Sequence, residues 1–240
     1  MCHSDASRPP SAPTTVPVAS SADLVLTAAD GNRVLAHEAR PTVPSGAGIV
    51  VMPDVRGLHE FYKALASRFA EVGVEAVAID YFGRTAPDDD RSEAFAFMPH
   101  VEQTTPEGVA ADVQAGVAHV CGNGASTVFT VGFCFGGGYS WRQSADTPGL
   151  AGCIGFYGRP ASGLEVPDRM TAPLLMLVAG ADAHIPVKDV REVADAAVVE
   201  AEFVVFDGAP HSFFDRTFAE HADAADQAWT RIQAFMAAHS

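Results

Sequence analysis

Long apolar runs are missing from this sequence of 240 residues. No window approaches the ~18 continuous apolar residues that a membrane-spanning helix needs. The N-terminal stretch MCHSDASRPPSAPTTVPVASS also lacks the charged segment followed by an apolar segment that marks a secretory signal. We therefore expect a cytoplasmic protein that has no membrane partner.

Basic residues are scarce as well. The sequence has 15 Lys and Arg against 30 Asp and Glu, a net charge of -15 at pH 7. Because no basic stripe offsets this excess, we expect neither a nucleic acid nor an anionic membrane surface as a partner. One or two well-placed arginines could still bind a small anionic substrate.

Cysteine is also rare. The four cysteines, at positions 2, 121, 134 and 153, form no closely spaced pairs, so the spacing of metal ligands is absent and a disulfide framework is not expected. The adjacent Cys2 and His3 offer two metal ligands, but a frayed terminus explains them more simply. We predict no metal and no cofactor, and we interpret Cys121 and Cys153 as ordinary buried thiols.

The domain organisation follows from composition and length. Residues 1–20 are rich in Pro, Ser, Thr and Ala without periodicity, and they are predicted to form a flexible N-terminal arm. Residues 21–240 are predicted to form a single domain, since 48% of the sequence is apolar and no internal repeat is visible. Residues 83–105 form one long irregular insertion, of a kind that often covers an α/β sheet as a lid.

Strand-like and helix-like segments alternate along the predicted domain. The turn signal Asp30-Gly31-Asn32 separates the first two strands and indicates a hairpin. The later alternation predicts a mostly parallel central sheet with helices on both faces, preceded by that antiparallel hairpin. The predicted strands are 24–27, 33–38, 48–52, 74–79, 127–133, 152–156, 174–178 and 203–206, and the predicted helices are 61–72, 105–120, a segment after 134, 187–199 and 218–235.

The stretch TVFTVGFCFGGGYSW, residues 127–141, places a thiol in a glycine-rich turn between a strand and a helix. Gly132 and Gly136 lie two residues before and two after Cys134, as a sharp turn that exposes a nucleophile requires. The N-terminus of the following helix favours the thiolate, and the amide of Phe135 is placed to donate to an oxyanion.

Two other interpretations of this stretch stay open. Cys134 could be a buried structural cysteine in a tight turn. The loop could instead bind a phosphate, but the dinucleotide pattern G-x-G-x-x-G fails because Cys134 occupies the place of the second glycine.

An acid and a histidine follow Cys134 in the order that α/β-hydrolases use. Asp182 comes after the strand 174–178, and His211 comes after the strand 203–206 and before the last helix. Each of the three residues follows its own strand, so together they predict an α/β-hydrolase fold with a nucleophile, an acid and a base. His184 is a rival base, although its simpler role is in the loop that holds Asp182.

The chain resembles the dienelactone hydrolase family, whose name member is carboxymethylenebutenolidase, over residues 23–238. The resemblance depends on MPDVRG (52–57), IDYFGRTAP (79–87), GFCFGGG (132–138), GFYG (155–158), GADAHIP (180–186) and GAPHSF (208–213). It implies a catalytic triad of Cys134, Asp182 and His211. It also implies hydrolysis of an enol-lactone that carries a carboxylate, without a metal.

The same resemblance implies accessory residues. Asp54 stands where the family pattern has glutamate, and the amide of Val55 would be the second oxyanion donor. Arg84 matches the first of two arginines that bind the substrate carboxylate in the family. Arg216 matches the second after a shift of one residue, because HSFFDRT is one residue longer than the family spacing.

Several further residues allow two interpretations. The aromatic residues Tyr81, Phe82 and Tyr157 either form a wall of the substrate pocket or cover the core. Arg56 is expected either near the pocket or as a surface partner of an acid. His59 either lines the mouth of the pocket or begins a solvated helix.

The sequence therefore predicts a hydrolase that opens an enol-lactone or cleaves a small ester through a thioester intermediate. Its partner is a small molecule that could be anionic, and the protein could be a monomer or a small homo-oligomer. A general thiol carboxylesterase or acyltransferase without carboxylate specificity is the first alternative. A ligand-binding protein without catalytic activity is the second.

Overall fold

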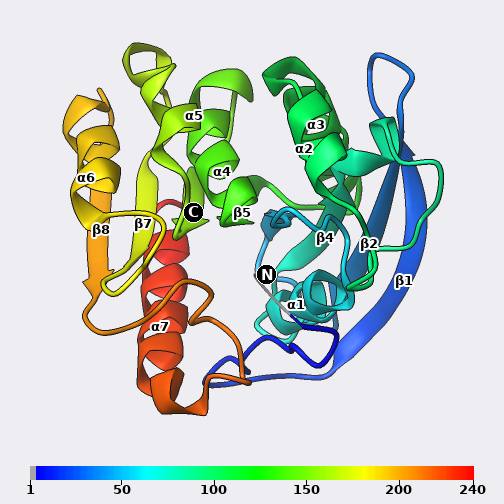
Figure 1. The fold of residues 1–240 in the computed structure, drawn as a ribbon. Helices are drawn as coiled ribbons and strands as arrows, with labels where there is room; N and C mark the ends of the chain where they lie inside the picture. The colour runs from blue at the N-terminus through cyan, green and yellow to red at the C-terminus, as the bar shows by residue number, and fades with distance from the viewer. Residues whose placement is uncertain (1–3) are drawn as a thin grey trace.

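A single eight-stranded sheet forms the centre of the computed structural model, which describes residues 4–240. The strands follow the order β1-β2-β4-β3-β5-β6-β7-β8, with β8 at one side of the sheet and β1 at the other (Figure 1). The strands are β1 (Val18–Thr27), β2 (Arg33–Pro41), β3 (Ala47–Met52), β4 (Glu75–Asp80), β5 (Thr127–Phe133), β6 (Gly152–Phe156), β7 (Leu174–Ala179) and β8 (Ala201–Phe206).

The sheet is parallel except at its first edge. β2 pairs antiparallel with both β1 and β4, whereas every later pair from β4 to β8 is parallel. This arrangement confirms the predicted mostly parallel sheet with an N-terminal hairpin. β3, β4, β6 and β7 are buried at every residue, whereas most of edge strand β1 is exposed. This burial explains why β3, β6 and β7 are continuous apolar runs in the sequence and why β4 is apolar between Glu75 and Asp80.

Helices cover both faces of the sheet (Figure 1). Leu65 of α1 and Trp229 of α7 belong to the core cluster on one face. Val113 of α3, Trp141 of α4 and Val190 of α6 belong to the cluster on the other. The helices are α1 (Glu60–Ala70), α2 (Met98–Gln103), α3 (Pro106–Gly122), α4 (Phe135–Asp146), α5 (Pro160–Leu164), α6 (Val187–Ala196) and α7 (Ala222–Ala238), and three short 3₁₀ turns are η1 (Tyr81–Arg84), η2 (Pro167–Arg169) and η3 (Ala219–His221).

The N-terminal segment differs from the loose arm that its composition predicts. Residues 4–17 lie on the body of the domain, and β1 begins at Val18 rather than near residue 24. The indole of Trp229 donates to the carbonyl of Pro10 at 3.2 Å, and the amide of Arg216 donates to the carbonyl of Arg8 at 3.0 Å. Proline-rich chain can pack through its carbonyl groups without any periodicity, which is why the sequence pattern misses it. Cys2 and His3, the two residues weighed as metal ligands, lie outside the described residues.

The insertion at residues 83–105 is anchored by a buried ion pair. The Arg91 guanidinium donates to Asp80 Oδ2 through Nε at 3.0 Å and through Nη2 at 2.7 Å, and it lies 4.4 Å from the centre of the Phe95 ring. The insertion contains the short helix α2. None of its residues lines the pocket described below, so the structure does not place it as a lid over that pocket.

The cysteines of the described part of the chain differ in their exposure. Cys153 is buried, as predicted, and burial raises the pKa of its thiol to about 12. Cys121 is exposed at the end of α3, so the prediction of a buried thiol is wrong for this residue. The helical pattern of α3 was identified correctly, but Cys121 lies on its solvent face. Across residues 4–240, no helix is both long enough and apolar enough to span a membrane.

Four parallel strands bring their carboxyl ends to one edge of the sheet. Cys134 follows β5, Tyr157 follows β6, and Asp182 and His211 lie in the loops after β7 and β8. Ligands of open α/β sheets bind at this edge, because the loops after neighbouring parallel strands meet there.

Glycines allow the turn after β5 to form. A Cβ atom on Gly132 would clash with the backbone carbonyl of Gly136, and a Cβ atom on Gly136 would clash with the carbonyls of Met52 and Pro53. Backbone atoms cannot rotate away as the end of a side chain can. The turn therefore tolerates no side chain at either glycine in its present geometry.

We expect Gly132→Ala to lower the free energy of unfolding by about 1–3 kcal/mol or more, because the added methyl group overpacks the turn against backbone. Gly122→Ala is the matched control, since a Cβ atom there meets nothing within 4 Å. Urea denaturation of both variants measures the difference. Equal stability of the two variants would contradict the close packing of the turn.

Candidate active site

Cys134 occupies a strained turn between β5 and α4. Its backbone has φ 54° and ψ -109°, in a region that residues other than glycine rarely adopt. Its amide donates to the carbonyl of Phe156 at 3.0 Å, which ties the turn to the end of the neighbouring strand. A strained turn between a strand and a helix is also found in the nucleophile elbow of α/β-hydrolases, which holds a side chain at the top of the sheet.

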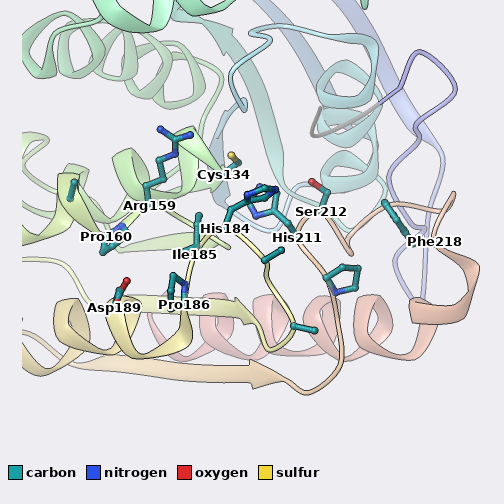
Figure 2. Close-up of a pocket in the computed structure, with 14 residues that line it drawn as sticks. Cys134, Arg159, Pro160, His184, Ile185, Pro186, Asp189, His211, Ser212 and Phe218 are labelled. Atoms are coloured by element: carbon teal, nitrogen blue, oxygen red, sulfur yellow. The ribbon is translucent and has the colours of Figure 1, made fainter.

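A pocket of about 770 Å³ lies beside Cys134 (Figure 2). Its walls come from the loops after β6, β7 and β8, and its size suits a small molecule. The titratable or charged residues that line it are Cys134, Arg159, His184, Asp189 and His211.

Asp182 and His211 form a short hydrogen bond in this pocket. His211 Nδ1 lies 2.6 Å from Asp182 Oδ2, and the Asp182 side chain is only 2% exposed. Asp182 Oδ1 accepts the amides of His184 at 2.9 Å and Ile185 at 3.1 Å. Since an ionised carboxylate only accepts, this network assigns the proton to His211 Nδ1, so that Nε2 is the basic nitrogen of the neutral ring.

The pKa of Asp182 reflects opposing effects. Burial alone raises it, but the hydrogen bond from His211 and the amides of His184 and Ile185 together bring the pKa below its ordinary value. Asp182 is therefore ionised at neutral pH, as a group that orients an imidazole and stabilises its protonated form must be.

The two candidate bases are now distinguished by their contacts. His211 presents its ring to Asp182, whereas His184 contacts Asp182 through its backbone amide. The His184 ring lies 6.4 Å from the His211 ring, and it also lines the pocket. The His211 side chain therefore contacts Asp182. His184 lies in the loop that holds Asp182, as its simpler interpretation predicts.

Backbone strain is concentrated at this pocket. Within residues 4–240, the three residues other than glycine with positive φ are Cys134, Tyr157 at 36° and Ser212 at 65°. The Tyr157 ring lies 4.7 Å from the His211 ring, and Ser212 directly follows His211. Strained residues of this kind cluster where the surrounding structure fixes a functional geometry. No sequence signal marked Ser212.

The two predicted oxyanion donors lie on neighbouring segments. Phe135 begins α4, and Val55 is in the loop after β3, where Met52 pairs in register with Gly132. The amides of Phe135 and Val55 donate to no acceptor within residues 4–240. Two unused amides beside the turn could therefore bind a negatively charged oxygen.

Asp54 and Arg56 lie beneath this region and do not line the pocket. Asp54 is fully buried, and its Oδ1 accepts the amide of Arg56 at 2.9 Å. The Arg56 side chain is also buried, with Nε 3.9 Å from Asp54 Oδ1. Its guanidinium forms no hydrogen bond to any residue of the described chain. Arg56 is therefore not the surface partner that one interpretation predicts.

The aromatic residues that the sequence singled out are all buried, and they separate into two groups. Tyr157 packs on His211. Tyr81 and Phe82 pack against Phe135, and the Tyr81 hydroxyl donates to the carbonyl of Pro53. Burial, together with the charges of Asp54, Asp80 and Cys134, raises the pKa of Tyr81 well above its ordinary value. Tyr81 and Phe82 thus support the turn from the core side.

His59 is buried and caps helix α1. Its Nδ1 accepts the amide of Phe61 at 3.1 Å, and its Nε2 lies 3.2 Å from Asp5 Oδ1. It does not line the mouth of the pocket.

The two arginines predicted to bind a substrate carboxylate are not brought to the pocket. Arg84 Nε and Nη2 contact the buried carboxylate of Asp112 at 2.9 and 2.7 Å, and Nη1 contacts Asp30 at 2.6 Å. Arg216 is exposed, and its recorded contact is the amide that binds Arg8. Neither arginine lines the pocket.

The arginine that does line the pocket is Arg159, which the sequence analysis missed. It directly follows the GFYG segment at the carboxyl end of β6. That location was the available signal, because site residues collect at this edge of the sheet. Within residues 4–240, no cluster of three or more His, Cys, Asp or Glu side chains could hold a metal ion.

Comparison with known proteins supports the resemblance. The model of the dienelactone hydrolase family matches residues 34–240. A Salmonella typhi protein provisionally named carboxymethylenebutenolidase is 28% identical over 244 residues, which cover 93% of this chain and 90% of that protein. A Bradyrhizobium protein provisionally named 2-oxo-3-(5-oxofuran-2-ylidene)propanoate lactonase is 28% identical over 88% of this chain and 91% of its own length.

A solved structure also supports the resemblance to the dienelactone hydrolase family. The crystal structure of a Klebsiella pneumoniae protein, provisionally named a dienelactone hydrolase, superposes with a TM-score of 0.76 at 26% identity, covering 91% of this chain and 98% of that one. An esterase from Pyrococcus furiosus, at 14% identity, shares the fold with a TM-score of 0.68. The chain belongs to the dienelactone hydrolase family and is a hydrolase of carboxylic esters or lactones.

Proposed function

We propose that this protein opens an enol-lactone through Cys134 as nucleophile, His211 as base and Asp182 as the group that orients the base. The observation that carries the proposal is the 2.6 Å contact between His211 and Asp182 in a pocket that the strained residue Cys134 also lines. A structural cysteine requires neither the strain nor an oriented imidazole.

The first half of the reaction forms a thioester. His211 Nε2 takes the thiol proton of Cys134, and the sulfur bonds to the carbonyl carbon of the lactone. The carbonyl oxygen becomes an oxyanion that the amides of Phe135 and Val55 bind. The bond between this carbon and the ring oxygen then breaks, and the proton passes from His211 to the enolate oxygen. The enol remains tethered to the acyl group.

The second half releases the acid. His211 takes a proton from water, and the resulting hydroxide attacks the thioester carbon. The carbon–sulfur bond breaks, and the thiolate of Cys134 regains its proton from His211. The net change is the addition of one water molecule across the ester bond. An enolate is a good leaving group, so the first half needs little help from a strong acid.

A general thiol esterase without a preference for anionic substrates is the second candidate. The position of Arg84 favours it, since its guanidinium is held by Asp112 and Asp30. This alternative uses the same three residues and differs only in what binds the rest of the substrate. The name of the Bradyrhizobium relative, which specifies a keto-acid lactone, supports the lactone assignment.

We expect iodoacetamide to label Cys134 faster than Cys121 or Cys153 near neutral pH. Cys134 is only 4% exposed, but it lines the pocket together with the proposed base His211, whereas Cys121 is in the last turn of α3 and Cys153 is buried with its pKa raised to about 12. Mass spectrometry of the labelled peptides gives the three rates. Cys121 is exposed, so it is the stricter comparison. Labelling of Cys134 at the same rate as Cys121, or more slowly, would contradict the proposed nucleophile.

We expect His211→Ala to lower kcat by at least about a hundredfold, because proton transfer by a positioned base contributes that much or more. His184→Ala is the matched control: it lies in the same pocket, and its contact with Asp182 runs through the backbone, which the substitution keeps. We expect it to change kcat less than about threefold, since it does not remove the base. Steady-state kinetics on one aryl ester compares them, and the opposite ranking would assign the base to His184.

A further inference from the structure

We propose that Arg159 binds an anionic group of the substrate and so determines which lactones this enzyme accepts. The inference deepens the function proposed above and depends on it, since it assigns the substrate class of the same pocket. It concerns a residue that lies outside the two arginines implied by the family resemblance.

The backbone around Arg159 is tied to both reactive groups. Phe156 accepts the amide of Cys134 at 3.0 Å, and the next residue, Tyr157, packs its ring 4.7 Å from the ring of His211. Arg159 follows two residues later. A side chain from this segment therefore starts close to the nucleophile and the base.

Glycine contacts fix this segment against the turn. A Cβ atom on Gly137 would clash with Gly158, and one on Gly138 would clash with the carbonyl of Arg159. Gly137 and Gly138 belong to the first turn of α4, directly after Cys134. The position of Arg159 relative to the nucleophile is thus set by contacts between backbones, which leave little freedom.

The Arg159 guanidinium is not used elsewhere. Across residues 4–240 it has no ion pair and no side-chain hydrogen bond, although acids outnumber bases 30 to 15 in the sequence. Arg84, Arg91 and Arg142 are all paired with carboxylates, at shortest contacts of 2.7 Å or less. An exposed arginine without a partner in such an acidic chain remains able to bind an anion.

The charges around the pocket give this arginine a distinct role. Arg159 is the one lysine or arginine among the described residues that line the pocket. Asp182 is hydrogen-bonded to His211. Asp189 lies on α6, apart from Arg159 and Cys134 in the view of Figure 2. The part of the pocket beside the nucleophile is therefore the part that favours a negative group. A guanidinium binds a carboxylate with two parallel hydrogen bonds, which also orients it.

The test uses two lactones of the same shape, one carrying a carboxylate and one carrying the neutral carboxamide. We expect Arg159→Gln to lower kcat/KM for the carboxylate about 10- to 150-fold, and for the carboxamide less than about threefold, because only the first loses a charge-assisted hydrogen bond. Arg33→Gln is the matched control, an exposed arginine at the start of β2 outside the pocket, and it should change neither value. Arg159→Lys should restore part of the loss.

An equal fall for both lactones in Arg159→Gln would show that Arg159 is structural, and no fall for the carboxylate would show that it does not bind the anion. Either result overturns the inference and leaves Cys134 as nucleophile.

Calorimetry separates the two proposals: a saturated lactone carboxylate should bind Cys134→Ala, and binding should weaken at least about tenfold when Arg159→Gln is added. If Cys134→Ala still turns over substrate, the proposed function is wrong. The inference about Arg159 would stand, because the binding measurement does not require catalysis.

Discussion

The close approach of backbones around Cys134 is the constraint on which the rest of the site depends. Gly132 and Gly136 let the strand turn into α4 within hard-contact distance of the segment 52–53, and Gly137 and Gly138 let the segment 156–159 pack on the same helix turn. Cys134 has positive φ because of this turn. Four glycines thus position the proposed nucleophile, one proposed oxyanion donor and the pocket wall together. A side chain at any of them would separate these parts.

The proposed acid, Asp182, and the proposed base, His211, are positioned by a second set of contacts at the same edge of the sheet. Asp182 accepts two amides of its own loop in addition to the imidazole of His211, so its carboxylate is fixed before it orients the base. Tyr157 links the two sets, since it packs on His211 and follows the residue that binds the amide of Cys134. The strain at Tyr157 and Ser212 is local, and the parallel strands beneath them keep it in place.

Local patterns predicted most of the fold, because period and turn residues determine strands and helices. The sequence also placed Cys134, Asp182 and His211 on loops that the structure brings to one pocket. It could not predict the direction of Arg84, whose side chain turns toward Asp30 and Asp112, 54 and 28 residues away in the sequence. It missed the packing of residues 4–17 and the position of Arg159, because neither has a periodic signature and both follow from tertiary contacts.

The central claim is that Cys134 carries the acyl group, and mass spectrometry of the enzyme during turnover tests it most directly. His211→Ala slows hydrolysis of the thioester, so the enzyme should accumulate an adduct when mixed with an activated enol ester. The account predicts that the peptide containing Cys134 gains the mass of the acyl group, and that Cys134→Ala gains none. An adduct on another residue, or steady turnover by Cys134→Ala, would contradict it.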